Sequence, residues 1–296
     1  ARFPVLLRSI LLLLGPLSCG QVTSAGPEHF SGELAYRHVQ AQVAIGPRYA
    51  GSEGAGKAAD YIAGELRRLG WEVEEQRFEY LGVALRNIVG ARGQGPVVML
   101  GAHYDSRRWA DRDPDPGRWR DPVPGANDGA SGVAILLELA RVLGRVDLQV
   151  QVRLAFFDAE DQGNIESWPW CIGSSYMARN LPLGQFPHYL VVVDMVGDAS
   201  QQLYWERFSD TELQRNIWDL AAELGYRDSF TPTLRHAMID DHRPFLERGI
   251  RAADIIDFDY PYWHTVADSA DKVSPQSLER VGRVLEEMVR RRVAIE

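Results

Sequence analysis

The residues PVVMLGAHYD (96–105) decide the fold, because an apolar run ends there abruptly at a histidine and an aspartate. A strand that is buried on both faces has this pattern, and such strands belong to parallel sheets covered by helices. Two further strand-like runs, 150–158 and 189–196, also carry acidic residues at or near their ends. The sequence therefore predicts a sheet with buried central strands and polar groups at the strand ends.

The segments around these strands alternate between helical and strand periodicity. The apolar spacing predicts helices over 58–69, 133–143, 210–224 and 277–293, and Gly70 ends the first of them. It predicts further strands at 72–80, 87–90 and 252–257. Strands separated by helices indicate the α/β class, with a mostly parallel sheet and helices on both faces. The Asp-, Arg- and Pro-rich stretch 109–124 is expected to be a polar surface loop.

Composition excludes several classes of protein. Of the 296 residues, 45% are hydrophobic and 25% are charged, which is ordinary for a globular protein. The net charge of -9 and the pI of about 5.4 argue against nucleic-acid binding. Two cysteines, Cys19 and Cys171, are too few for a disulfide scaffold or a cysteine-rich zinc module. Any metal ion would therefore need His, Asp and Glu ligands.

Residues 1–25 are expected to form an export signal. Arg2 and Arg8 precede a short apolar stretch over 9–19, which is too short to span a bilayer. Cys19 is an alternative lipid-attachment site, but Pro16 stands where a lipoprotein signal usually has leucine, so simple secretion is preferred. A buried N-terminal helix is the remaining alternative. No later segment is long and apolar enough to cross a membrane. From the predicted export signal we expect an exported protein, either periplasmic or secreted.

Acidic residues and histidines recur where predicted strands end or where a helix begins. In α/β sheets, ligands bind outside the carboxyl ends of the strands, so these side chains should converge. Each alone could be a helix cap, a solvated acid or a hydrogen-bonded histidine. Their recurrence favours a cation site, because clustered carboxylates repel one another. The residues concerned are His103, Asp105, Asp128, Glu160, Asp161, Asp194 and His264.

Carboxylate and imidazole ligands without thiolates suit a catalytic zinc ion. Such ligands bind zinc at about 2.0–2.2 Å and leave one position for water or substrate. Glu160 and Asp161 are adjacent at a strand end and can point in different directions. One of them can therefore bind the metal while the other transfers protons.

Five motifs in order resemble the zinc aminopeptidase and glutaminyl cyclase superfamily. The similarity covers about residues 30–296, and GPRYAGSEG (46–54) is also typical of that family. It implies a single catalytic domain with a three-layer α/β/α architecture around a mixed sheet, as in zinc exopeptidases. The motifs are HYDS (103–106), GANDGASG (125–132), FFDAED (156–161), DMVG (194–197) and WHT (263–265).

In two-zinc aminopeptidases, the resemblance implies that the position of Asp128 bridges the metals. Glu160 occupies the position of the general base. Aminopeptidases often have glutamate where this chain has Asp161, and the shorter side chain can still bind the metal. The remaining ligand positions are His103 and Asp194 for one zinc, and Asp161 and His264 for the other.

In glutaminyl cyclases, the same scaffold holds one zinc. The resemblance implies that Asp128, Asp161 and His264 hold this zinc and that Glu160 carries a proton from the α-amine to the leaving amide. Two further acids support a hydrogen-bond network there, and they correspond to Asp194 and Asp240.

The segments that separate these branches favour the cyclases. IDDHRPFL (239–246) resembles cyclases, whereas aminopeptidases usually have Ser-Asp-His there, and SWPWCIGS (167–174) resembles bacterial cyclases. Trp168 and Trp263 are expected to form apolar walls around a small substrate side chain, although Trp168 could equally pack in the core. Asp241 and His242 could simply tie their loop together.

The sequence thus predicts an exported zinc enzyme that acts on peptide N-termini. A glutaminyl-peptide cyclotransferase is the first hypothesis, and a two-zinc metalloaminopeptidase is the alternative. A pure binding protein with decayed ligands is disfavoured, because every ligand position holds a competent residue. The oligomeric state and the peptide substrate stay open.

Overall fold

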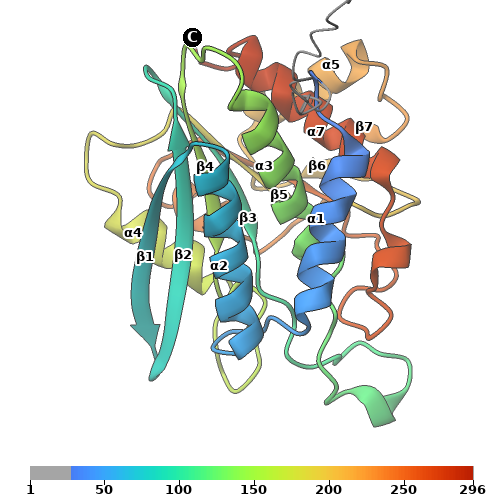
Figure 1. Ribbon diagram of the computed structural model, residues 1–296. Helices are drawn as coiled ribbons and strands as arrows, with labels where there is room; N and C mark the ends of the chain where they lie inside the picture. Colours follow the sequence, from blue (N-terminus) through green and yellow to red (C-terminus); the bar gives the residue numbers. More distant parts are fainter. Residues whose placement is uncertain (1–27, 296) are drawn as a thin grey trace, which may run out of the picture.

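The computed structural model describes residues 28–295 (Figure 1). The predicted export signal and Cys19 lie outside the described residues. Within the described range, every helix is too short or too polar to cross a membrane.

A six-stranded mixed sheet forms the centre of the fold, in the order β1-β2-β4-β3-β5-β8. Strands β4, β3, β5 and β8 run parallel, whereas β1 and β2 pair in antiparallel fashion with each other and β2 pairs so with β4. The predicted mostly parallel mixed sheet is confirmed, with its antiparallel part confined to one edge. The strands are β1 Glu72–Tyr80, β2 Val83–Arg92, β3 Val97–His103, β4 Gln151–Phe157, β5 Tyr189–Asp194 and β8 Ala252–Ile256.

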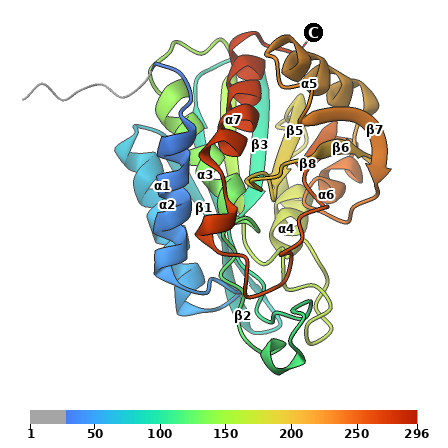
Figure 2. The same ribbon diagram turned by 90° about the vertical axis from the view of Figure 1, so that its right-hand side faces the viewer.

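Helices cover both faces of this sheet. Side chains of β3 alternate between the two sides, so that Leu100 packs with one helical layer and Met99 with the other. The first layer contains α1 Gly32–Ile45, α2 Glu53–Arg68, α3 Ala130–Leu143 and α7 Pro275–Arg290, and the second contains α4 Ile172–Asn180 and α6 Arg243–Leu246 (Figure 1; Figure 2). The predicted three-layer α/β/α architecture is therefore confirmed.

The parallel strands bring their carboxyl ends to one edge of the sheet. His103 at the end of β3 lies in register with Phe157 at the end of β4. Asp194 ends β5 and lies in register with Ile256 of β8. Residues that are distant in the sequence therefore meet where these strands end.

Helix α3 is the most deeply buried helix, since every residue except Arg141 is buried. Gly132 allows its first turn to lie directly on the sheet. A Cβ atom at this position would lie 2.4 Å from the carbonyl oxygen of Val193 in β5. This close approach places the loop before α3, which contains Asp128, at the sheet edge.

Several elements were not predicted from the sequence, and their patterns explain why. Helix α4 is nine residues long and has small and polar residues in its middle, and β7 exposes most of its side chains. The stretch 109–124 carries the short 3-10 helix η1 Pro116–Arg118, but Asp113 within it is buried. The prediction of a surface loop therefore holds only for its outer part. The other unpredicted elements are α1, α6, the 3-10 helix η2 Ala270–Lys272 and β6 Leu203–Glu206, which pairs with β7 Phe230–His236. Helix α5 Thr211–Glu223 was predicted.

Replacement of Gly132 by Ala should destabilise the fold. The added methyl group would clash with the backbone of β5, so we expect the free energy of unfolding to fall by about 1–3 kcal/mol. Gly64→Ala in α2 is the matched control, because nothing lies within 4 Å of its added Cβ. That control should raise the free energy of unfolding by about 0.5–1 kcal/mol. Urea denaturation measures both, and equal effects would contradict the close packing of α3 on β5.

Candidate metal centre

The five predicted metal ligands meet at the carboxyl edge of the sheet. All are buried, and each comes from a different segment. They are His103 at the end of β3, Asp128 before α3, Asp161 after β4, Asp194 at the end of β5 and His264 after β8.

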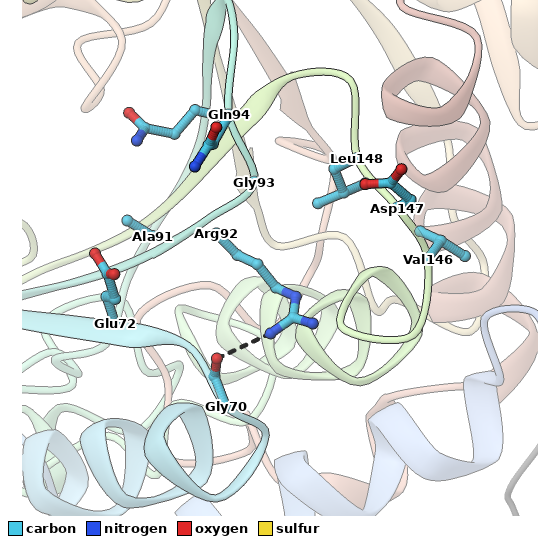
Figure 3. A pocket seen from close by; sticks show the side chains of 10 residues that line it. Gly70, Glu72, Ala91, Arg92, Gly93, Gln94, Val146, Asp147 and Leu148 are labelled. Carbon is cyan, nitrogen blue, oxygen red and sulfur yellow. Dashed lines mark hydrogen bonds between the residues drawn. The ribbon is translucent and has the colours of Figure 1, made fainter.

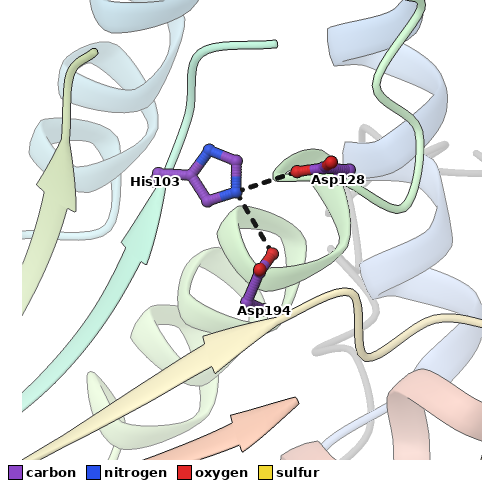
Figure 4. A group of neighbouring side chains, drawn as sticks. All are labelled: His103, Asp128 and Asp194. Carbon is purple, nitrogen blue, oxygen red and sulfur yellow. Dashed lines mark hydrogen bonds and ion pairs between the residues drawn. The ribbon is translucent and has the colours of Figure 1, made fainter. Parts of the chain in front are cut away.

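The first group contains His103, Asp128 and Asp194 (Figure 4). His103 Nε2 lies 3.2 Å from Asp128 Oδ1 and 3.1 Å from Asp194 Oδ1. His103 Nε2 and Asp194 Oδ1 form a hydrogen bond with each other.

The second group contains Asp128, Asp161 and His264. His264 Nε2 lies 2.9 Å from Asp161 Oδ1 and 3.7 Å from Asp128 Oδ2. Asp128 therefore belongs to both groups, with Oδ1 toward the first and Oδ2 toward the second. This is the geometry of a carboxylate that can bridge two ions.

The second group fits a zinc ion. Asp128 Oδ2, both carboxylate oxygens of Asp161 and His264 Nε2 are buried without a hydrogen-bond partner. Buried polar atoms without partners are costly, by about 1–3 kcal/mol each and more for charged groups. A zinc ion would satisfy these atoms, since two carboxylates and one imidazole leave a fourth position open for substrate.

The pKa values of Asp161 and His264 indicate an excess of negative charge in the second group. When no cation is bound, burial and the neighbouring Asp128 raise the pKa of Asp161 to about 6. Burial alone would lower the pKa of His264, but Asp161, Asp111 and Asp128 together outweigh it and raise the pKa to about 9. The imidazolium form thus balances the carboxylates, which is the electrostatic role that a metal ion would take over.

Asp105 holds the two ends of β3 and β4 together. Its Oδ1 accepts a hydrogen bond from the backbone N–H of Glu160 at 3.0 Å, and its Oδ2 accepts one from Asp161 at 3.1 Å. Its Oδ1 also lies 3.4 Å from His103 Nδ1. The buried carboxylate of Asp105 therefore orients the ring of His103 and the backbone of Asp161.

Two residues whose roles were not predicted from the sequence fix the loop that carries Asp128. Asp268 accepts hydrogen bonds from the backbone of Asn127 at 2.9 Å and of Asp128 at 3.2 Å. The fully buried Arg48 donates to the carbonyl oxygen of Gly125 at 2.6 Å. Arg48 belongs to the GPRYAGSEG motif, but only the folded chain shows which carbonyl groups it contacts.

Glu160 is buried beside the second group and faces the same pocket as Asp161. Burial raises its pKa well above the usual value, and the charges of Asp161, Asp241 and Asp240 add to this effect. The thiol of Cys171 donates a hydrogen bond to Glu160 Oε1 at 3.4 Å. Glu160 is thus a buried carboxyl group with a raised pKa that belongs to neither candidate ligand group.

A further set of acids lies behind the pocket. His242 is fully buried, with Nε2 3.2 Å from Glu206 Oε2, so it lies in the interior rather than at the pocket. Asp254 is also fully buried, and burial together with the charge of Asp240 raises its pKa well above the usual value. Protons therefore balance part of the negative charge here.

The centre opens into a pocket of about 230 Å³ with an apolar wall. Trp263 lines it as expected and stacks on His264, with ring centroids 3.8 Å apart. Trp168 does not line this pocket, which corrects the prediction: it packs edge-on against Tyr80 at 5.1 Å in a separate apolar cluster. Trp170 lines the pocket instead. Acidic walls come from Asp128, Glu160, Asp161, Asp194 and Asp240, and further apolar walls from Met195, Met238, Ile239, Ile256 and Phe258.

A larger hollow of about 440 Å³ lies at the opposite end of the parallel strands (Figure 3). Its charged lining residues are Glu72, Arg92 and Asp147, and Arg92 donates a hydrogen bond to the carbonyl oxygen of Gly70 at 2.9 Å. This lining contains neither a histidine nor a pair of buried acids, in contrast to the candidate metal centre at the other end of the strands.

Known proteins share this architecture and sequence. Aminopeptidase YwaD of Bacillus subtilis is 30% identical over 201 residues, covering 63% of this chain and 39% of that protein, so the chain spans about two fifths of this relative. The glutaminyl cyclase structure of Porphyromonas gingivalis has a TM-score of 0.84 and 34% identity, covering 89% of this chain and 99% of that one. A Zn-dependent exopeptidase structure from Parabacteroides distasonis has a TM-score of 0.82 and 33% identity, covering 88% and 98%.

The profile of peptidase family M28 matches residues 87–289, which is more than half of the chain. The matched region begins in β2, ends in α7 and contains every residue of both candidate ligand groups. The chain therefore belongs to peptidase family M28.

Proposed function

We propose that this chain is a zinc-dependent glutaminyl-peptide cyclotransferase, which converts an N-terminal glutamine into pyroglutamate and releases ammonia. The observation that carries the proposal is the set of unpartnered donor atoms of Asp128, Asp161 and His264 beside Glu160, in a small pocket with aromatic walls. These three residues would hold one zinc ion. When bound, zinc acts as a Lewis acid that polarises the side-chain amide carbonyl of the substrate.

The residues of the chain supply orientation and proton transfer. The α-amine nitrogen attacks the γ-carbonyl carbon, a C–N bond closes the ring, and the bond to the side-chain nitrogen breaks to give ammonia. Glu160 accepts the proton that the amine loses and returns it to the leaving nitrogen, so no water is consumed. The pocket walls of Trp170 and Trp263 favour the folded substrate and exclude water, which would compete with the amine.

Asp194 and Asp240 are proposed as supporting acids. Both line the pocket close to Glu160. Burial and the charge of Asp128 raise the pKa of Asp194 to about 7, in spite of the neighbouring His103. A carboxyl group of this kind can share a proton with its neighbours near neutral pH and so stabilise successive charge states of Glu160.

A two-zinc metalloaminopeptidase is the alternative, and one observation favours it: Asp128 is shared between two complete ligand groups. Two observations support the cyclase. His103 Nε2 and Asp194 Oδ1 are hydrogen-bonded to each other, whereas Asp161 Oδ1 and His264 Nε2 of the second group have no hydrogen-bond partner. The segment Asp240-Asp241-His242 resembles cyclases.

The remaining parts of the prediction are also proposals. Residues 30–296 would form the single catalytic domain, and residues 1–25 would direct export to the periplasm or the medium. Attachment of lipid at Cys19 is the alternative fate of that segment. The substrates would be N-termini of peptides or proteins, in keeping with the acidic pocket, whose carboxylates can accept hydrogen bonds from an α-amine.

Replacement of Glu160 by Gln should separate metal binding from catalysis. Glu160→Gln retains shape but cannot exchange the proton, so ammonia release should fall by about 10²–10⁴-fold while zinc content is unchanged. Asp128→Ala should lose both zinc binding and ammonia release. Glu166→Gln is the control, because Glu166 pairs with Arg108 at the surface, at 2.9 Å. Full activity of Glu160→Gln would show that another group carries the proton.

A comparison of peptide substrates should distinguish the cyclase reaction from the aminopeptidase reaction. Peptides that begin with Gln should release ammonia and keep their full sequence, whereas peptides that begin with Leu should stay intact. An ammonia assay and mass spectrometry of the peptides measure both. A Gln-peptide with an acetylated α-amine is the control and should not react, because its nitrogen cannot attack. Release of free leucine, with no ammonia from Gln-peptides, would establish the aminopeptidase instead.

A further inference from the structure

We infer that Asp111, in the connection between β3 and α3, is the residue that positions His264 for the metal ion. The connection spans residues 104–129 and includes the stretch whose outer part is a surface loop. The inference rests on the proposed zinc centre but not on which reaction that centre performs.

Asp111 lies on the far side of the His264 ring from the other ligands. Asp111 Oδ1 is 3.3 Å from His264 Nδ1, whereas His264 Nε2 is 2.9 Å from Asp161 Oδ1. A carboxylate that accepts the Nδ1–H fixes the tautomer of the ring and leaves the lone pair of Nε2 free for a metal ion. Such a partner also makes Nε2 a more basic ligand.

Asp111 is itself held in place by Arg107. The guanidinium Nη2 donates to Asp111 Oδ2 at 2.6 Å, and Nε donates to Oδ1 at 3.2 Å. The Arg107 side chain is only 2% exposed, and its Nη1 donates to the carbonyl oxygens of Asp161 at 3.0 Å and Gly163 at 2.8 Å. The guanidinium group of Arg107 thus fixes both the carboxylate of Asp111, which lies behind His264, and the backbone of Asp161.

The remaining contacts of His264 restrain its ring but do not choose its tautomer. Trp263 stacks on one side at 3.8 Å, and Trp170 lies nearly parallel at 6.0 Å. His264 has a φ of 57°, a left-handed conformation that only surrounding contacts can maintain in a residue other than glycine. Aromatic rings offer no acceptor for Nδ1–H, so the carboxylate of Asp111 provides the directional contact.

The two candidate ligand histidines are supported differently. Asp105, beside His103, is buried and also holds the backbone of Glu160 and Asp161, so its replacement would disturb the whole edge of the sheet. The Asp111 side chain is 40% exposed, and among the described residues it contacts Arg107 and His264. Asp111 can therefore be replaced without opening the core.

The test compares the zinc affinity of four forms of the full chain. These are the unaltered protein, Asp111→Ala, Asp111→Asn and the control Asp121→Asn, whose aspartate lies in the same connection and pairs with Arg118 at 3.2 Å. Competition with a chromophoric chelator gives the Kd for zinc, and circular dichroism verifies folding. Asp111→Ala should weaken binding by about 10–100-fold. Asp111→Asn keeps an acceptor oxygen and should recover part of the loss, and Asp121→Asn should be unchanged.

A zinc Kd of folded Asp111→Ala within twofold of the unaltered protein would overturn the inference, as would an equal loss in Asp121→Asn. If Asp111→Ala does not fold, Asp111→Asn provides the test. This variant lacks the carboxylate charge, and an unchanged zinc Kd for it would also contradict the inference. Tight zinc binding that depends on Asp111, in a protein without ammonia release from Gln-peptides, would support this inference while refuting the cyclase proposal.

Discussion

The repulsion between buried carboxylates at the carboxyl edge of the sheet is the constraint on which the rest of the structure depends. Parallel strands deliver Asp161 and Asp194 to the same small volume, and the loop before α3 adds Asp128. Such a cluster is stable only if a cation, an imidazolium or bound protons balance its charge. Without an ion, the raised pKa values of Asp161 and His264 mean that bound protons and an imidazolium balance this negative charge. The unpartnered carboxylate oxygens mark the place where a metal ion would balance it instead.

The surrounding side chains act on the backbone more than on the ion. Asp105 accepts two successive backbone N–H groups after β4, and Asp268 accepts two before α3. Arg48 and Arg107 donate to backbone carbonyl groups on the same loops. The ligand loops are thus held by charged hydrogen bonds that are stronger than neutral ones. This rigidity matters for the proposed reaction, because ring closure within one substrate depends on orientation.

The strand and ligand positions could be predicted because they depend on local patterns. An apolar run ending in His103 indicates a buried strand and a polar end at once. Four of the five candidate ligands lie at or after such strand ends, whereas Asp128 precedes a helix. The choice between Trp168 and Trp170 could not be predicted, because the two residues lie in one loop but Trp168 packs in an apolar cluster whereas Trp170 lines the pocket. The role of Asp111 was hidden for another reason: its polar, proline-rich surroundings resemble any surface loop, and its partner His264 is distant in sequence.

The central claim is that Asp128, Asp161 and His264 share one divalent ion. Diffraction from crystals of the zinc-loaded protein, recorded on both sides of the zinc absorption edge, tests it most directly. The account predicts an anomalous peak about 2.0–2.2 Å from one oxygen of each aspartate and from His264 Nε2. A crystal that contains zinc but shows no peak among these three side chains, or shows one only between His103 and Asp194, would contradict it.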